Sequence, residues 1–475
     1  MYKNFKINDP AIEKYFDTRE DISVEENVFD KDEGFWNEAR HEKLSENEEK
    51  IYTMIDTLKD LPVVKTYVQL VNIIATGYKV WGPIEIGNIF TFVNFNEIEG
   101  PRFKFGLQTS NDFSKRLLLG AYVAYGIKDQ EFKYAGNFLY LLTKKPRQSL
   151  SGSYRFDLTN TSDVDENFGQ GGLLTNIILR RKAEGEKIPI KLLKVREAKL
   201  FYEKEWIVGF STKVGVLNRR SDPYFNFRYK VEPENINGDT LINSVTSTEF
   251  SVSARFAYQE KFISGEFNRI SLGSKRPIVR LKYSLGIKNM VQSDFHFHRI
   301  DLTVFDKIPI NPIGKLRYIL QVGKVFGTVP YLLMEIHDGN EGFFSSSYRF
   351  SMMNEYEFAS DFYTTLFLQH HFDGFLFDKI PGVRKLKLRA FVSGKALFGR
   401  MSEKNLKANR YNLEGNSQDG DIVAIKTANR VPYVEVAVGI ENILKILKAE
   451  VVWRLTHKRT NTHNFGFRFG AELSF

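Results

Sequence analysis

From about residue 84 to the C-terminus, apolar and polar residues alternate along the chain with a period of two. Because successive side chains of a β-strand point to opposite faces, this pattern predicts strands with one apolar face. Many of these strands are about ten residues long, the length that crosses a bilayer when a strand is tilted. The last predicted strand is the clearest, with one face made of Phe465, Phe467, Phe469, Ala471, Leu473 and Phe475.

A soluble β-sandwich and a membrane barrel both show such alternation, and strand length and aromatic content separate them. Strands of soluble proteins average about five or six residues, and the predicted strands run to about twice that length. The chain holds 22 Tyr and 41 Phe, and these aromatic residues recur near strand ends, as in the aromatic girdles of outer-membrane barrels. We therefore predict an all-β fold over residues 83–475, a transmembrane antiparallel β-barrel of about 16 strands.

The predicted connections differ in length. Outer-membrane barrels carry short turns at one end and long loops at the other, and closing the sheet leaves no open edge in lipid. Short connections are predicted at 111–114, 128–130 and 442–445, and long polar ones at 160–194, 230–247, 328–345 and 400–430.

The two-residue period is absent from the N-terminal part of the chain, before about residue 84. Residues 1–45 are acidic and without a period, which predicts an irregular linker. Ser45 then precedes acidic residues and an apolar helical spacing, which predicts a helix over 46–59. A second apolar stretch, 61–75, is too short and too polar to span a bilayer, and we expect an interfacial or barrel-docked helix. Together these form a predicted helical segment over 46–82.

Composition excludes several classes of function. The chain has no cysteine, so a disulfide scaffold, a thiolate metal site and a cysteine nucleophile are excluded. The net charge of +9 comes from basic residues interleaved with acidic ones, so no nucleic-acid partner is predicted. The first 20 residues lack the apolar core of a secretory signal. We expect a protein that either is not exported or is a piece of a longer chain.

Charged residues on the polar faces of the predicted strands are the candidate functional residues. They form either a charge ladder in the lumen that sets permeation or holds a plug, or ordinary ion pairs that satisfy the interior of a narrow barrel. The candidates are Arg102, Glu357, Asp361, Glu435, Arg454, Arg468 and Glu472.

Two further groups were weighed as chemical sites. The pairs His296 with His298 and His370 with His371, together with an acid, suggest zinc or copper, but aromatic filling or lumen polarity explains them equally well. A hydrolase needs a serine, a histidine and an acid together, and the nearest approach is residues 337–338 with 345–347. The spacing there carries no hydrolase signature. We predict no catalytic residue, no metal and no cofactor, and a protein that is not an enzyme.

Several segments resemble an uncharacterised Bacteroidota outer-membrane β-barrel family that usually follows a carboxypeptidase-regulatory-like β-sandwich domain. The resemblance extends from about Phe35 to the C-terminus and implies that a signal peptide and the sandwich domain precede the barrel, so that this chain is N-terminally truncated. The segments that carry it are 95–106, 122–134, 354–361, 368–374, 432–443 and 452–456.

More distantly, the predicted barrel is similar to the surface-antigen superfamily of BamA-like assembly factors, which have about 16 strands and a closing Phe. The Arg-Gly motif of that superfamily has no clear copy here. We therefore expect an integral outer-membrane barrel with a structural or transport-related role. An assembly or translocation factor is the first alternative, and a barrel-embedded hydrolase is the second. The expected partners are the lipid bilayer of the outer membrane, the barrel assembly machinery during biogenesis, and an envelope protein complex.

Overall fold

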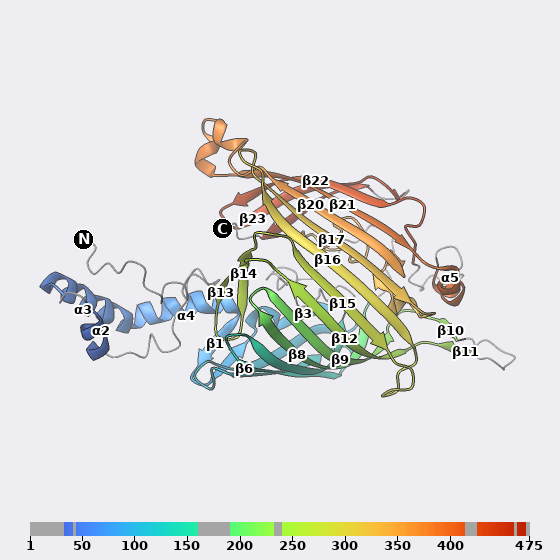
Figure 1. The fold of residues 1–475 in the computed structure, drawn as a ribbon, viewed down its shortest axis with the longest axis horizontal. Helices are drawn as coiled ribbons and strands as arrows, with labels where there is room; N and C mark the ends of the chain where they lie inside the picture. The colour runs from blue at the N-terminus through green and yellow to red at the C-terminus, as the bar shows by residue number, and fades with distance from the viewer. Residues whose placement is uncertain are drawn as a thin grey trace.

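The fold was analysed in a computed structural model that describes residues 33–40, 44–159, 191–231, 240–413, 425–459 and 463–471. Its main feature is one antiparallel sheet of 18 strands that curls into a barrel (Figure 1). The all-β prediction is confirmed. The strand number exceeds the expected 16 because the first three strands are short segments of four residues each.

The sheet follows the order of the chain, with each long strand antiparallel to the next. At its beginning β1 (Tyr78–Trp81) pairs with β2 (Ile84–Gly87), and both β2 and β3 (Val93–Asn96) pair with β4. The sheet thus starts before the predicted boundary at residue 83. The remaining strands are β4 Gly100–Thr109, β5 Leu117–Gly126, β6 Phe132–Thr143, β7 Gln148–Thr159, β8 Leu193–Ile207, β9 Phe210–Pro223, β12 Val245–Phe256, β15 Ile278–Gly286, β16 Phe297–Pro309, β17 Lys315–Phe326, β20 Phe362–His371, β21 Arg389–Arg400, β22 Tyr433–Ile443, β23 Leu447–Arg454 and β24 Phe465–Ala471.

The distribution of side chains is inverted relative to a soluble protein. The rings of Phe105 and Phe467 and the side chain of Val123 point outward and are 53%, 61% and 50% exposed. Arg454 and Arg468, which alternate with such residues, point inward and are 2% and 1% exposed. The alternating pattern therefore turns the apolar rows to the outside of the barrel and the charged rows to its interior.

Strand direction separates the connections into two ends. The short connections 110–116 and 444–446 lie at one end, which we call the turn end, and the β17–β20 and β21–β22 connections lie at the other, the loop end. The expected division by length is wrong at 128–130, because this short connection joins β5 to β6 at the loop end. The turn end also carries a longer connection with a separate hairpin, β13 (Lys261–Ser264) and β14 (Arg269–Gly273) (Figure 1).

The N-terminal helices stand at the turn end. Helix α3 (Glu46–Asp60) begins with a capping box between Ser45 and Glu48, where the sequence predicts a helix over 46–59. Helix α4 (Pro62–Thr76) starts with proline and ends at Gly77, which has a φ of 80°. Figure 1 shows α4 extending away from the barrel, and its Tyr67 is 67% exposed, so the barrel-docked alternative is wrong. In the described part of the chain, no helix is both long and apolar enough to span a membrane.

The prediction that residues 1–45 are irregular is also wrong in part. Helix α2 (Glu33–Ala39) lies within that segment, and the rings of Phe35 and Trp36 contact each other edge to face at 5.4 Å. The remaining short elements lie in connections. They are η2 Ile89–Thr91, β10 Tyr229–Val231, β11 Thr240–Ile242, η4 Tyr331–Leu333, β18 Glu335–Ile336, β19 Ala359–Ser360, η5 Phe377–Lys379, η6 Val383–Leu386, α5 Glu403–Ala408 and η7 Arg410–Asn412.

Candidate functional site

Residues 327–361, which connect β17 to β20, fold back into the barrel interior, and we call them the lumen loop. Phe350, Met353 and Tyr356 of this loop are at most 1% exposed. The loop contacts inward-facing residues of β21 to β24, which makes it an internal plug rather than an external loop. Five of the seven charged residues singled out in the sequence belong to the loop, follow it directly or contact it.

The centre of the loop is held through its main chain. The carboxylate of Glu435 on β22 accepts hydrogen bonds from the amides of Ser351 and Met352, at 2.6 and 2.9 Å. From β24, the Nε of Arg468 donates to the carbonyl oxygen of Ser351 at 3.0 Å. Hydrogen bonds to charged groups are shorter and stronger than neutral ones, so two wall strands on either side of β23 fix one point of the loop.

A buried ion pair holds the next turn of the loop. The guanidinium of Arg454 on β23 donates to both carboxylate oxygens of Glu357, at 2.6 and 3.0 Å, and lies 4.8 Å from the ring centre of Tyr433. Arg459 makes a second ion pair with Glu357 at 3.4 Å. Burial alone would raise the pKa of the Glu357 carboxyl, but the hydrogen bonds and charge of Arg454 outweigh burial and hold that pKa below its ordinary value.

A third anchor is Lys395 on β21, which was not among the charged residues predicted from the sequence. Its ammonium group donates to the carbonyl oxygens of Ser346 and Arg349 and to the hydroxyl of Ser351. The ammonium also lies 3.7 Å from the carboxylate of Glu435. Lys395 lies on the inward face of β21, so alternation along this strand is the signal that could have marked it.

The ends of the loop are fixed near the loop end of the barrel. The carboxylate of Asp361 contacts the ammonium of Lys324 and accepts hydrogen bonds from the amide of Ser402 and the side-chain amide of Asn405, all at 2.8–2.9 Å. His337 lies 3.0 Å from the hydroxyl of Ser360. Burial, together with the nearby positive charge of Arg299, lowers the pKa of His337 to about 3, so this histidine is neutral.

Apolar side chains complete the packing, so the interior is not the wholly hydrophilic lumen that alternation predicts. Some inward rings come from connections, such as Phe350 and Phe358, and others come from strands, such as Phe367 and Tyr433. Phe350, Phe358 and Tyr433 form one cluster between the loop and the barrel wall. A larger cluster near the loop end comprises Phe225, Phe227, Tyr331, Tyr356, Met401 and their neighbours.

Two sequence candidates lie elsewhere. Arg102 pairs with Glu99 at 3.1 Å and with Asp157 at 2.8 Å, inside the wall formed by β4 to β7. Lys133 joins the same group through Glu99. These contacts link strands of the wall to one another and do not involve the lumen loop. Glu472 lies outside the described residues, as do Leu473 and Phe475 of the last predicted strand.

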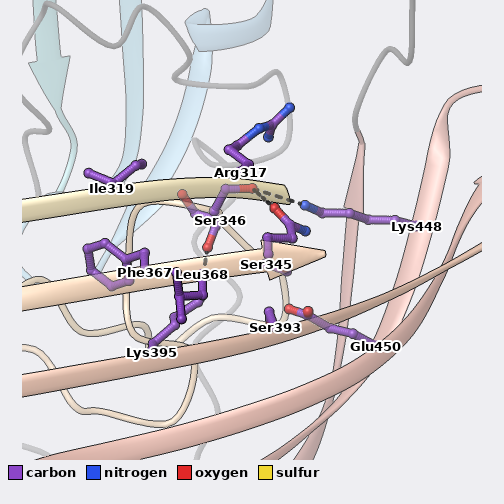
Figure 2. Close-up of a pocket in the computed structure, with 12 residues that line it drawn as sticks. Arg317, Ile319, Ser345, Ser346, Phe367, Leu368, Ser393, Lys395, Lys448 and Glu450 are labelled. Atoms are coloured by element: carbon purple, nitrogen blue, oxygen red, sulfur yellow. Dashed lines mark hydrogen bonds between the residues drawn. The ribbon is translucent and has the colours of Figure 1, made fainter. Parts of the chain in front are cut away.

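A small cavity lies beneath the loop, on the side of the turn end (Figure 2). Ser345, Ser346 and Ser347 of the loop line it, and Lys448 approaches the hydroxyl of Ser347 at 3.5 Å. The cavity does not assemble the histidine, acid and serines weighed as a hydrolase, because His337 contacts Ser360 instead. The other lining residues are Arg317, Ile319, Phe367, Leu368, Gln369, Ser393, Lys395 and Glu450.

Neither histidine pair brings both of its rings to one acid. His298 contacts the hydroxyl of Tyr283 and lies edge to face with His296. His371 points inward to Glu441 at 2.8 Å, and His370 contacts the carbonyl oxygen of Ile313. Within the described ranges, no three histidine or acidic residues gather in a geometry that would hold a metal ion.

The two ends of the sheet, β1 and β24, are not joined by a strand ladder within the described residues. Instead, the lumen loop reaches the outer edge of β24. The amide of Phe469 donates to the carbonyl oxygen of Phe343 at 3.0 Å, and the amide of Ser345 donates to the carbonyl oxygen of Phe469 at 2.5 Å. This makes a parallel bridge between Phe344 and Phe469. The expectation of a fully closed ladder is therefore not met in the described part of the chain.

A comparison with known protein families identifies the family of this chain. Residues 74–405 match the model of the C-terminal domain of DUF5686, a family of unknown function. The chain belongs to this family. No curated protein matches it.

Solved structures similar to this DUF5686 chain include BamA from Haemophilus ducreyi lacking POTRA domains 1–3, with a TM-score of 0.47 and 11% identity over 79% of this chain and 68% of that one. CdiB from Acinetobacter baumannii has a TM-score of 0.38 and 11% identity, over 79% of this chain and 57% of that one. CdiB from Escherichia coli has a TM-score of 0.39 and 10% identity, over 82% of this chain and 62% of that one. This chain thus spans less than two thirds of either CdiB chain.

Proposed function

We propose that this protein is an integral β-barrel of the bacterial outer membrane, with a transport-related or structural role, no enzymatic activity, and a lumen closed at rest by its own loop. The observation that carries the proposal is the inverted wall, with apolar rows outside and buried charges inside. A polypeptide with this distribution needs an apolar solvent, and antiparallel strands of about ten residues match the thickness of a bilayer.

The lumen loop supports the closed state. Four neighbouring strands each supply one charged residue that binds the loop. These residues are Lys395, Glu435, Arg454 and Arg468. Buried charged anchors with several partners give the loop one position, because releasing it leaves those charges without hydrogen bonds.

Two measurements test the proposal. The purified chain should require detergent to remain monomeric, and a detergent-free soluble monomer would refute the membrane assignment. In planar bilayers, the intact protein should show little conductance, and replacing residues 340–356 with a short Gly-Ser linker should open a large, steady pore. The same linker in place of the exposed residues 288–292 is the matched control and should leave conductance unchanged.

A second candidate is a factor that assembles or translocates other outer-membrane proteins. The observation that favours it is the edge of β24, which pairs with a loop segment rather than with another strand ladder. Depletion in the native cell tests this candidate. The levels of other outer-membrane barrels should fall, and unchanged levels would remove the candidate.

The sequence segments shared with the Bacteroidota barrel family support an origin in that group of bacteria. We include in the proposal that the barrel assembly machinery inserts this protein and that it works beside other envelope proteins. A pull-down of the intact complex from native membranes identifies such neighbours, and recovery of the barrel alone would argue against them.

A further inference from the structure

Two arginines lie opposite each other on the outer surface of the barrel, near the loop end. Arg196 on β8 is the register partner of Arg220 on β9, and both side chains are exposed. The outward rows of the two strands continue toward the turn end with exposed apolar residues such as Leu200 and Val214. Residues directly opposite in an antiparallel pair have Cβ atoms about 4.5–5.5 Å apart, and like charges at such positions are destabilising.

A third cation and an aromatic ring belong to the same surface. Lys194 lies on the same face of β8, two residues before Arg196. The Lys194 ammonium group lies 5.2 Å from the ring centre of Phe156 on β7, and the Arg196 guanidinium lies 5.3 Å from it. Phe156 is the register partner of Arg196 on the side away from Arg220. Its ring therefore holds both cations on the outer surface through cation–π contacts. We call Lys194, Arg196 and Arg220 the basic patch.

Acidic residues compensate only part of the charge of the basic patch. Glu131 pairs with Lys194 at 2.7 Å, and Asp222 pairs with the Nε of Arg220 at 3.2 Å. Among the residues that the structure describes, Arg196 contacts the Phe156 ring but no carboxylate. A guanidinium carries five N–H donors, so both arginines retain donors for a ligand.

The chemistry of the basic patch defines the ligand. An anion that binds both guanidinium groups relieves their repulsion, and the fork of N–H donors on a guanidinium matches the oxygens of a phosphate. Neutral polar molecules lack the charge that this arrangement requires. The ligand is therefore a phosphate group.

The position of the basic patch defines where the phosphate comes from. The patch lies where the apolar outward rows meet the loop end, which is the depth of lipid headgroups when the barrel lies in a membrane. Tyr134 and Tyr154 flank it with exposed rings, as in the aromatic girdle of a membrane barrel. The acyl chains of a phosphorylated lipid pack on the apolar rows below the patch, whereas a free phosphate ion gains nothing from them.

We propose that Lys194, Arg196 and Arg220 form a binding site for the phosphate group of a lipid in the leaflet at the loop end. Arg196 and Arg220 bind the phosphate oxygens, and Lys194 adds positive charge. This inference rests on the proposed function in one respect, that the wall lies in a membrane. The bound phosphate turns a repulsive arginine pair into a contact that stabilises the barrel in a membrane with phosphorylated lipid.

The test measures lipid binding to the full chain in dodecyl maltoside micelles. The probe is phosphatidic acid with two oleoyl chains. Phosphatidylcholine with the same chains is the comparison lipid, because its choline group neutralises the charge of the phosphate. Native mass spectrometry counts the bound lipids during a titration. Phosphatidic acid should bind about ten-fold more tightly than phosphatidylcholine, and inorganic phosphate at the concentration of the lipid should not displace it.

Substitutions assign the binding to the patch. Arg196→Gln and Arg220→Gln should each weaken the binding of phosphatidic acid about ten-fold. Arg116→Gln, which removes the same charge at an exposed position of the turn end, is the matched control and should bind as the natural chain. Without lipid, Arg196→Gln should not lower the thermal midpoint of unfolding, because it removes a like-charge pair, whereas loss of a merely structural residue would lower that midpoint.

Two results would overturn the inference. One is equal affinity of Arg196→Gln and Arg116→Gln for phosphatidic acid, and the other is displacement of the lipid by inorganic phosphate. Failure of the proposed function is visible separately, because a barrel folded in detergent migrates faster on a gel before heating than after heating. A chain without that behaviour contradicts the membrane barrel, whereas a folded barrel with equal affinities contradicts only the lipid site.

Discussion

Replacing Glu357 with Gln should release the lumen loop. The substitution keeps the size of the side chain but removes the charge that compensates Arg454, a residue that is 2% exposed and bound to Glu357 through two nitrogens. Removing one partner of a buried ion pair costs about 3–5 kcal/mol, because the other charge stays buried without compensation. Arg459 then loses its ion pair with the same carboxylate as well.

A cost of about 3 kcal/mol raises the fraction of molecules with a released loop by about 100-fold. Hydrogen exchange measures this release directly, because the amides of Ser351 and Met352 are protected only while the loop is in place. Their exchange in Glu357→Gln should accelerate by about two orders of magnitude. Glu97→Gln, at an exposed position in the connection before β4, is the control.

A double variant separates the ion pair from other effects. If Glu357→Gln acts by leaving Arg454 uncompensated, then adding Arg454→Gln should restore part of the protection of the loop amides. Loop amides that exchange at the natural rate in Glu357→Gln would refute the reasoning, because the pair would then contribute nothing to closure.

Three further predictions concern single residues. The pKa of His337 is about 3 in the folded protein and about 6.5 when exposed, so the stability of the loop should be full above pH 6.5 and fall by about 1.4 kcal/mol per pH unit as the pH drops from there toward 3. Loop exchange followed against pH checks this, and His337→Gln should flatten the profile. Gly314 has a φ of 106°, and an added Cβ would lie 1.9 Å from the carbonyl oxygen of His371. Gly314→Ala should therefore lower the thermal midpoint of barrel unfolding. Gly394→Ala is the control and should leave that midpoint unchanged, because an added Cβ there meets open space. Ser45→Ala should reduce the stability of α3 by about 1 kcal/mol, seen as faster exchange of the amide of Glu48 with the barrel unchanged.

The wall of the barrel was predictable because its signal is local. Adjacent residues of a strand point to opposite faces of the sheet. The inward positions of Arg454 and Arg468 therefore follow from their alternation with Trp453 and Phe467. The apolar rows and the ladder from β4 to β24 needed no knowledge of distant contacts. Helix α3 was accessible for the same reason, since its cap lies within four residues of its start.

The lumen loop was not predictable, because its partners are distant in the chain. Glu357 and Arg454 are 97 positions apart, and Ser351 and Glu435 are 84 apart. The sequence marks the loop only as a long polar connection, and gives no sign that it turns inward. Alternation marks the charges of the wall as inward but leaves open what they bind, which is why the sequence fits both a charge ladder that sets permeation or holds a plug and ordinary ion pairs inside a narrow barrel.

The way the wall holds the loop has a consequence for variation among relatives. Glu435, Arg468 and Lys395 bind mainly peptide groups of residues 346, 349, 351 and 352, and peptide groups are the same whatever side chain they carry. A saturation mutagenesis survey should therefore find the half-buried positions 346 and 349 permissive and the three wall residues intolerant. Selection would then preserve the backbone path of the lumen loop while its amino-acid sequence changes. Homologues would keep the same closure of the lumen with little sequence identity within the loop.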